Sequence, residues 1–222
     1  PDRFFDCGIA EANMVTMAAG LSSTGLIPFC STFAVFASRC YEQIRNGVCY
    51  PKLNVKFAFT HAGITVGEDG GSHQALEDIN LMRGLPNMTV LVPADGPEAY
   101  KAVMAAAAYD GPVYIRLGRS AVPTVTDPDA DFVIGKGKLL REGTDVTLIA
   151  CGMMVAVALD AAELLAAEGV NAAVIESPIS LQAASIFFLT SSSRRKLTIV
   201  CDISATSSYQ EYSTACCVKQ SL

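Results

Sequence analysis

The feature that most constrains the fold of this chain is the alternation of short β-rich runs with helical stretches along its first 176 residues. Strands that alternate with helices in this way form mainly parallel sheets. The sequence therefore predicts an α/β protein with helices over Glu11–Leu21, Pro97–Tyr109 and Val155–Glu168. The candidate strands are Arg3–Cys7, Leu26–Cys30, Val55–Thr60, Thr89–Pro93, Val113–Leu117, Val146–Ala150 and Ala172–Ile175.

Two of the expected helices carry recognisable end signals. Asp95 precedes the second helix, with Glu98 three residues on, which is the spacing of a capping box. The third helix runs into Gly169, the residue type favoured just beyond a helix C-terminus. These signals indicate where the helices begin and end.

The chain is expected to fold as two domains joined by a linker. Residues 123–144 contain Pro, Asp, Gly and Lys and are interpreted as a linker with a short strand, between a first domain at 1–122 and a second at 145–222. From about residue 177 the composition changes, because the tail has none of the 17 glycines and is rich in Ser. We interpret this tail as aberrant, as after a shift of reading frame, and expect it to be poorly packed, although Leu197–Ile203 could still form a strand.

Composition excludes several classes of function. The chain is 51% hydrophobic and 17% charged, and no apolar run reaches the roughly 18 residues of a membrane span. A formal charge of −6 argues against nucleic acid as the main partner. The eight cysteines form no C-x-x-C pair, so no metal site is predicted, and most, including Cys7, Cys30, Cys49 and Cys151, are interpreted as small buried apolar residues of a reduced, cytoplasmic protein.

Both histidines of the chain lie in one glycine-rich loop that follows a candidate strand. The loop runs from His61 to His73 and also carries Glu68 and Asp69. In open α/β sheets, ligands bind at the carboxyl ends of strands, and glycines allow close approach of the backbone. A ligand site and an ordinary polar surface loop are both open on these facts.

Five further side chains are candidates, each with a plainer alternative. Glu11 opens an apolar helix, where it either complements the helix dipole or acts on a ligand as a buried carboxylate. Phe33 and Phe36 either pack in the core or provide a stacking platform for a flat ring. Arg116 and Arg119 end a strand, and either at least one of them reaches a phosphate or both are surface residues.

Taken together, the ordered segments of residues 1–119 resemble transketolase, and residues 120–176 resemble the linker and the start of its C-terminal domain. The resemblance is carried by Phe5–Met14, Ser31–Phe36, Thr60–Gln74, Leu85–Met88, Val92–Asp95 and Gly111–Arg119. It implies a pyrimidine-binding domain for thiamine diphosphate at 1–122, followed by an incomplete C-terminal domain. The family's first strand and helix of this domain are expected to precede Pro1.

The resemblance assigns roles to the candidate residues. Glu11 matches the catalytic glutamate that acts on the aminopyrimidine of thiamine diphosphate, and Phe36 matches the ring that stacks on it, with Phe33 beside it. Asp69 and the catalytic His73 match residues that hold donor hydroxyls.

His61 and Arg119 match contacts to the acceptor and the phosphate. The implied reaction is transfer of a two-carbon ketol unit between sugar phosphates, as in the pentose phosphate pathway.

The resemblance also implies a partner. In the family, a separate domain with a Gly-Asp-Gly motif holds the diphosphate and its divalent metal, expected to be magnesium, and we find no such motif in this sequence. The chain therefore resembles the second chain of a split transketolase, inactive without its N-terminal half. A homo-oligomer of the pair, with the active site at a dimer interface, is expected. The alternatives are a 1-deoxy-D-xylulose-5-phosphate synthase, a dehydrogenase E1 β-like subunit and a non-catalytic pairing subunit, with His61 and the Gly67–His73 string favouring transketolase.

Overall fold

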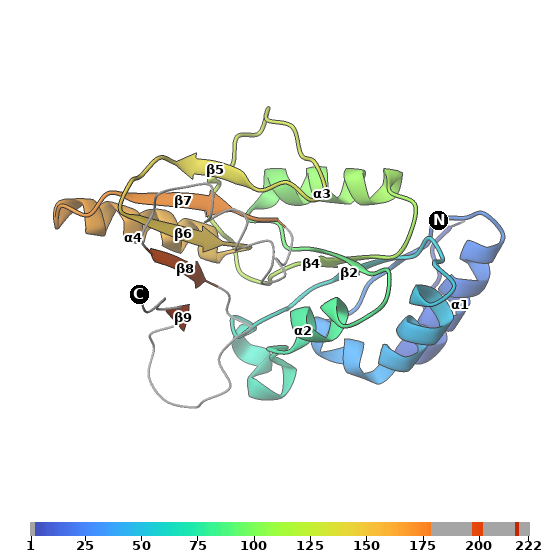
Figure 1. Ribbon diagram of the computed structural model, residues 1–222. Helices are drawn as coiled ribbons and strands as arrows, with labels where there is room; N and C mark the ends of the chain where they lie inside the picture. Colours follow the sequence, from blue (N-terminus) through green and yellow to red (C-terminus); the bar gives the residue numbers. More distant parts are fainter. Residues whose placement is uncertain (1–2, 179–196, 202–215, 218–222) are drawn as a thin grey trace. The chain divides into compact units, whose positions relative to one another are not determined.

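The computed structural model describes residues 3–178, 197–201 and 216–217, and it is an α/β protein with two sheets (Figure 1). The fold class predicted from the alternation of strands and helices is thereby confirmed. The chain divides into two compact units: unit 1 is Pro1–Val90 with Ala106–Arg119, and unit 2 is Leu91–Ala105 with Ser120–Leu222.

Unit 1 is built on a four-stranded sheet with the strand order β1-β2-β4-β3. Strand β1 pairs in parallel with β2, and β2 in parallel with β4. The unit border passes through β3 (Thr89–Leu91) and α3 (Gly96–Ala108). The other elements of unit 1 are α1 (Glu11–Ser23), β1 (Phe29–Cys30), η1 (Ala34–Cys40), η2 (Gln43–Cys49), β2 (Lys56–Phe59), η3 (Gly67–Asp69), η4 (Gly71–His73), α2 (Asp78–Arg83) and β4 (Val113–Arg116).

Apolar side chains hold unit 1 together on the sheet and under α1. Helix α1 buries Val15 and Ala18 and packs against η1, η2 and β1. On the sheet, the buried ring of Phe59 meets Phe57 and Tyr114 edge to face, at centroid distances of 5.8 Å and 5.7 Å. Edge-to-face packing is the arrangement that aromatic rings prefer.

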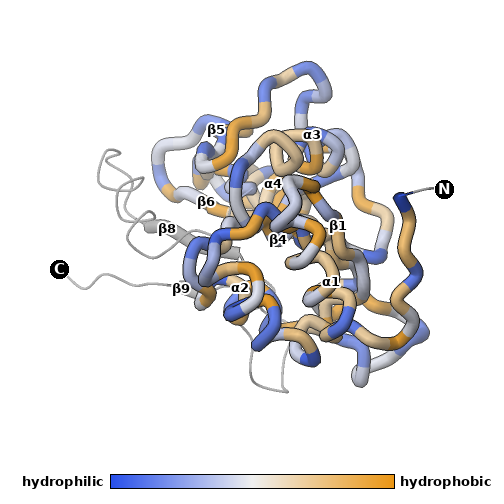
Figure 2. Tube along the Cα trace, turned by 90° about the vertical axis from the view of Figure 1, so that its right-hand side faces the viewer, coloured by the Kyte–Doolittle hydropathy of each residue, from blue (hydrophilic) through white to orange (hydrophobic). Residues whose placement is uncertain are grey.

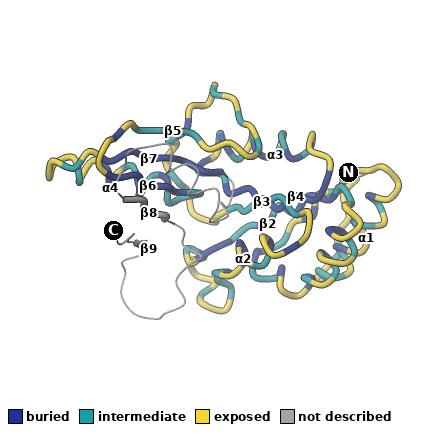
Figure 3. The backbone as a smooth tube through the Cα atoms, viewed as in Figure 1, coloured by how far each residue is buried: buried dark blue, intermediate teal, exposed yellow. Residues whose placement is uncertain are grey.

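Unit 2 is built on a five-stranded sheet with the strand order β5-β7-β6-β8-β9. Strand β6 is flanked in parallel by β7 and β8, while β5 and β9 are antiparallel to their neighbours. Strands β6 and β7 are buried along their whole length (Figure 3), and α4 covers them with an apolar face. The elements are β5 (Lys138–Arg141), β6 (Val146–Ala150), α4 (Met154–Ala167), β7 (Ala172–Glu176), β8 (Leu197–Cys201) and β9 (Cys216–Cys217).

One predicted strand is wrong. Residues Arg3–Cys7 form a turn and a stretch without regular secondary structure, and the segment mixes hydrophilic and hydrophobic residues (Figure 2). Phe4 and Phe5 are 78% and 59% exposed, so no neighbouring strand or core face covers them. Instead, the amide of Gly8 donates to the Asp6 carboxylate (2.9 Å), which turns the chain into α1.

The predicted helix ends are confirmed with one difference. The Glu98 amide donates to Asp95 Oδ1 (3.0 Å), as an N-cap requires, but the Glu98 carboxylate accepts from the amide of Ala94 and not from that of Asp95. Gly169 follows α4 with φ +82°, the left-handed conformation expected of a residue just beyond a helix.

The tail is only partly described. Leu197–Cys201 forms β8 beside β6, as the sequence allowed, and most of the remaining residues from 179 onward lie outside the described residues. The expectation of an aberrant, poorly packed tail therefore stays a prediction. Among the residues that are described, no helix is long and apolar enough to cross a membrane.

Candidate active site

Two aromatic rings stand in a row at the start of η1. Phe33 is the N-cap of this 3-10 helix and Phe36 lies in its first turn. In a 3-10 helix, residues three apart eclipse each other, with a rise of about 2 Å per residue. The two rings accordingly lie 6.1 Å apart, centroid to centroid, with an angle of only 8° between their planes. The sequence spacing thus produces a ladder of parallel rings.

Both histidines join this ladder. His61 stacks on Phe33, with centroids 3.7 Å apart and planes 15° apart. His73 meets Phe33 and Phe36 edge-on, at 6.3 Å and 5.7 Å. The loop histidines and the two phenylalanines, which the sequence could treat only as separate candidates, therefore form one cluster in unit 1.

The ends of the strands bring His61 to Phe33. The amide of Thr60 donates to the carbonyl of Thr32 (2.9 Å), and the amide of Ala34 donates to the carbonyl of Thr60 (2.7 Å). His61 itself adopts φ +58°, a left-handed conformation that costs a non-glycine residue on the order of 1–3 kcal/mol. Strain of this kind persists where the surroundings enforce it, and it is typical of ligand sites.

The loop that carries the histidines is closed at its base. The amide of Gly63 donates to the carbonyl of Ala75 (2.8 Å), and the amide of Ala62 donates to the carbonyl of Leu117 at the end of β4 (3.2 Å). The loop from Gly63 to Ala75 is therefore held at the carboxyl edge of the sheet, where ligands bind in folds of this type.

A buried carboxylate locks the segment that follows the loop. Asp78, 1% exposed, accepts hydrogen bonds from Tyr114 Oη (2.7 Å) and from Arg116 Nε (2.8 Å) and Nη2 (3.2 Å). Burial, and then the Asp78 carboxylate, hold the pKa of Tyr114 well above its usual range. In the sequence, both Arg116 and Arg119 were candidates for binding a phosphate. In the structure, the Arg116 guanidinium binds the Asp78 carboxylate.

Arg119 and Asp69 lie on the exposed side of the loop. The Arg119 guanidinium lies so close to Gly67, at φ +76°, that a Cβ there would come within 2.9 Å of Nη1. A side chain at position 67 would be strained by this positive φ, and the exposed Arg119 guanidinium would have to shift to make room for it. Asp69 is exposed at the end of η3 and makes no hydrogen bond or ion pair with another described residue.

Glu11 opens α1, and its side chain is only 10% exposed. One oxygen lies 3.6 Å from Nη1 of Arg39, and the Arg39 guanidinium lies 4.6 Å above the centre of the Phe36 ring. Arg39 therefore connects Glu11 to the aromatic ladder. Cys40 is next to it in η1, and burial, with a smaller effect of Glu11, raises the pKa of its thiol to about 12, which makes the thiol inert.

This constellation can be compared with known families. The family model for the transketolase pyrimidine-binding domain matches residues 1–125. The family model for the transketolase C-terminal domain matches residues 135–186. The chain belongs to the transketolase family. The match confirms the resemblance seen in the sequence.

Curated relatives fall into two groups. The chain is 51% identical over 179 residues to a putative transketolase C-terminal section of Methanocaldococcus jannaschii, covering 79% of this chain and 57% of the relative. It is 47% identical to a 6-deoxy-6-sulfo-D-fructose transketolase subunit of Clostridium sp. strain MSTE9, over 79% of this chain and 55% of the relative. It is also 43% identical to 1-deoxy-D-xylulose-5-phosphate synthase of Pelotomaculum thermopropionicum, over 80% of this chain and 28% of the relative. The chain thus spans little more than half the length of the first two relatives.

Solved structures agree with this family assignment. A protein described as a split gene transketolase, inactive beta4 tetramer, is 50% identical with a TM-score of 0.81, over 90% of this chain and 65% of that one. Transketolase from Campylobacter jejuni is 26% identical with a TM-score of 0.74, over 88% of this chain and 34% of that one. A longer transketolase chain therefore contains a region with this fold.

The residues present fit the aminopyrimidine part of thiamine diphosphate. A flat heterocycle needs an aromatic face, which Phe36 offers, and a carboxylate for its ring nitrogen, which Glu11 offers from a nearly buried position. Sequence reasoning missed Arg39 and Asp78. The spacing of Phe33, Phe36 and Arg39 could have revealed the first, whereas Asp78 becomes visible only when β4 and α2 are packed together.

Proposed function

We propose that this chain supplies the pyrimidine-binding half of a transketolase that moves a two-carbon ketol unit between sugar phosphates. The observation that carries the proposal is the convergence of Glu11, the Phe33–Phe36 ladder and both histidines in unit 1. In this proposal, a separate N-terminal half holds the diphosphate and the metal. The inactive state named for the 50%-identical split transketolase supports the expectation that this chain alone does not turn over.

Each side chain then has a task. Glu11 holds and exchanges a proton at the pyrimidine nitrogen, and Phe36 supports the flat ring with Phe33 behind it. When bound, thiamine diphosphate supplies a carbon nucleophile and stabilises negative charge on the transferred fragment. His73 and Asp69 bind donor hydroxyls, and His61 contacts the acceptor.

Arg119 is the proposed phosphate ligand. Its guanidinium is exposed beside the loop, while that of Arg116 is engaged by the buried Asp78. A planar guanidinium binds phosphate through paired, charge-assisted hydrogen bonds. Arg119 therefore sets the preference for phosphorylated sugars.

A second candidate is a synthase that joins pyruvate to an aldose phosphate. The 43% identity to 1-deoxy-D-xylulose-5-phosphate synthase favours it, since both activities use the same cofactor face. The two reactions differ in the donor, because pyruvate loses carbon dioxide and a ketose phosphate does not.

The test is reconstitution with a candidate N-terminal half, thiamine diphosphate and magnesium. The mixture is assayed with a ketose phosphate or with pyruvate as donor, each with an aldose phosphate acceptor. Ketol transfer without release of carbon dioxide supports the transketolase assignment. Reaction with pyruvate alone replaces it by the synthase, and no reaction with either donor, in a pair shown to bind the cofactor, contradicts both.

A further inference from the structure

Arg39 continues the ladder of Phe33 and Phe36 by one more step of three residues. All three stand on one face of η1, because side chains three apart eclipse in a 3-10 helix. Phe33 and Arg39 therefore lie toward opposite ends of the row, with Phe36 between them. Phe33 stacks on His61, and the Arg39 guanidinium lies 4.6 Å from the centroid of the Phe36 ring.

The same guanidinium also forms an ion pair with the Glu11 carboxylate. Nη1 of Arg39 lies 3.6 Å from the Glu11 oxygen, while the Arg39 side chain remains 54% exposed and Glu11 is 10% exposed. A nearly buried carboxylate is costly without a partner, so the long arginine side chain reaches in from solvent to neutralise it. Among the described residues, Arg39 makes the only ion pair of Glu11.

These two contacts are those that an aminopyrimidine needs. A guanidinium is flat, carries N–H groups in its plane and stacks on aromatic faces. An aminopyrimidine is also flat, and its N–C–N edge resembles the amidine portion of a guanidinium. Both groups place a ring or plane on Phe36 and nitrogen atoms toward Glu11, so they compete for one place.

We propose that Arg39 is a placeholder, which occupies the pyrimidine position on Phe36 and Glu11 in the free chain and leaves when the cofactor ring enters. The inference rests on the proposed function, in which these two residues bind that ring. Arg39 is exposed enough to swing into solvent without disturbing the buried residues of η1, Ala34, Ala37 and Cys40. In the free chain it keeps a buried carboxylate neutralised and an aromatic face covered.

Displacing Arg39 weakens cofactor binding by the strength of the two contacts that are lost. A cation–π contact and an exposed ion pair together correspond to about a three- to thirtyfold change in dissociation constant. Substitution of Arg39 is therefore expected to tighten binding of thiamine diphosphate by this factor. The penalty in the wild type falls as salt rises, because salt screens the ion pair with Glu11.

The test measures equilibrium binding of thiamine diphosphate with magnesium to the full chain paired with its N-terminal half. Arg39→Met keeps the length of the side chain but removes the charge and the plane, and Arg39→Lys keeps only the charge. Arg45→Met is the matched control, since Arg45 is exposed on η2 and, among the described residues, its side chain bonds only to the neighbouring Asn46 (3.0 Å). In parallel, nuclear magnetic resonance follows the Arg39 side-chain protons, which the Phe36 ring shifts upfield in the free chain.

Tighter binding by Arg39→Met, an intermediate value for Arg39→Lys, no change for Arg45→Met and loss of the upfield shift on cofactor addition support the placeholder. Equal or weaker binding by Arg39→Met, or an upfield shift retained in the complex, overturns it and leaves the proposed function standing. A wild-type pair that binds no thiamine diphosphate contradicts the proposed function, and the placeholder falls with it.

Discussion

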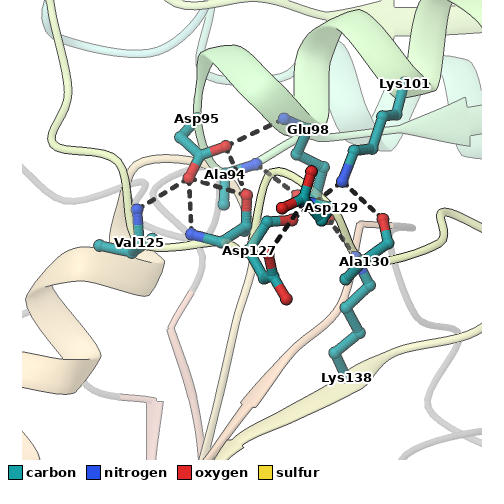
Figure 4. Close-up of polar contacts among 10 residues, drawn as sticks. Ala94, Asp95, Glu98, Lys101, Val125, Asp127, Asp129, Ala130 and Lys138 are labelled. Carbon is teal, nitrogen blue, oxygen red and sulfur yellow. Dashed lines mark hydrogen bonds and ion pairs between the residues drawn. The ribbon is translucent and has the colours of Figure 1, made fainter.

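The carboxylates of Asp95 in unit 2 and Glu11 in unit 1 are held in opposite ways. In unit 2, Asp95 is buried and accepts hydrogen bonds from the amides of Val125 (2.8 Å), Thr126 (2.7 Å) and Glu98 (3.0 Å), as Figure 4 shows for its labelled partners. Burial alone raises the pKa of Asp95, but the bonds from Thr126 and Glu98 outweigh it and hold the pKa below its usual value. In unit 1, Glu11 opens a helix with only a long contact to an exposed arginine.

Two further carboxylates of unit 2, those of Glu98 and Glu176, are also buried. Glu98 accepts from the amide of Ala94 (2.8 Å) and lies 3.6 Å from Nζ of Lys138 (Figure 4). Glu176 is fully buried beside it, and burial, followed by the Glu98 carboxylate, raises the pKa of Glu176 to about 9. Glu176 is thus a neutral acid at pH 7.

The difference shows how to separate structural from functional carboxylates in one chain. A structural carboxylate in unit 2 has its partners fixed by backbone amides or is neutralised by burial. The candidate functional groups of unit 1 stand at the carboxyl edge of a sheet, with aromatic rings beside them and loosely held partners. Four predictions can break or sharpen this contrast.

The largest effect is expected from Glu11→Gln in the reconstituted enzyme. If Glu11 exchanges a proton with the cofactor, kcat falls by about 10²- to 10⁴-fold while KM for the sugars changes little. Hydrogen exchange at C2 of thiamine diphosphate, measured by nuclear magnetic resonance, slows in step. An unchanged exchange rate in the mutant contradicts the role of Glu11. Glu42→Gln, at an exposed position of unit 1, serves as the control.

Asp78→Ala is expected to destabilise unit 1 by about 3–5 kcal/mol, because it removes the buried carboxylate that forms an ion pair with Arg116. Tyr114→Phe removes one hydrogen bond to Asp78 and costs about 1 kcal/mol. Both changes in the free energy of unfolding are to be measured by urea denaturation of the full chain. If Asp78→Ala is as stable as Tyr114→Phe, the carboxylate does not lock the segment after the loop.

Arg119→Ala is expected to raise KM for phosphorylated sugars by an amount worth about 1.5–3 kcal/mol. Non-phosphorylated analogues are expected to react with nearly unchanged KM, because they make no phosphate contact. The comparison of the two substrate types in the reconstituted enzyme is the measurement. Equal losses for both assign Arg119 a structural role.

Glu176→Gln tests the neutral acid of unit 2. Because the folded-state pKa, about 9, is above the ordinary value of 4.5, the unfolded chain ionises first as pH rises. The wild type therefore loses stability between about pH 4.5 and pH 9, by about 4 kcal/mol from pH 5 to pH 8. Gln mimics the protonated acid, so the mutant shows a flatter profile in urea denaturation. An unchanged pH slope means that Glu176 ionises normally in the folded chain.

Much of this architecture could be predicted from local sequence signals. Strand Val146–Ala150 and the helix ending before Gly169 follow from an apolar run and a helix stop. The strand predicted at Arg3–Cys7 failed because aromatic composition cannot say whether a pairing partner exists. The 3-10 and π turns of η1 and η2 were not predicted, since their geometry depends on packing under α1.

Local sequence signals likewise predict some features of the candidate site and not others. His61 and His73 could be singled out because they share one glycine-rich loop after a strand. Their contacts with Phe33 and Phe36 depend on strands β1 and β2 lying side by side, which no local pattern specifies. The roles of Glu11, Asp69 and Arg119 in turnover remain predictions for the experiments above.

The most direct test of the account compares the highly purified chain alone with the chain mixed with its N-terminal half. Both samples receive thiamine diphosphate, magnesium, a ketose phosphate and an aldose phosphate, and ketol transfer is followed. The account predicts no turnover by the single chain and turnover by the mixture, because unit 1 provides only the pyrimidine face of the site. Turnover by the single chain would contradict it.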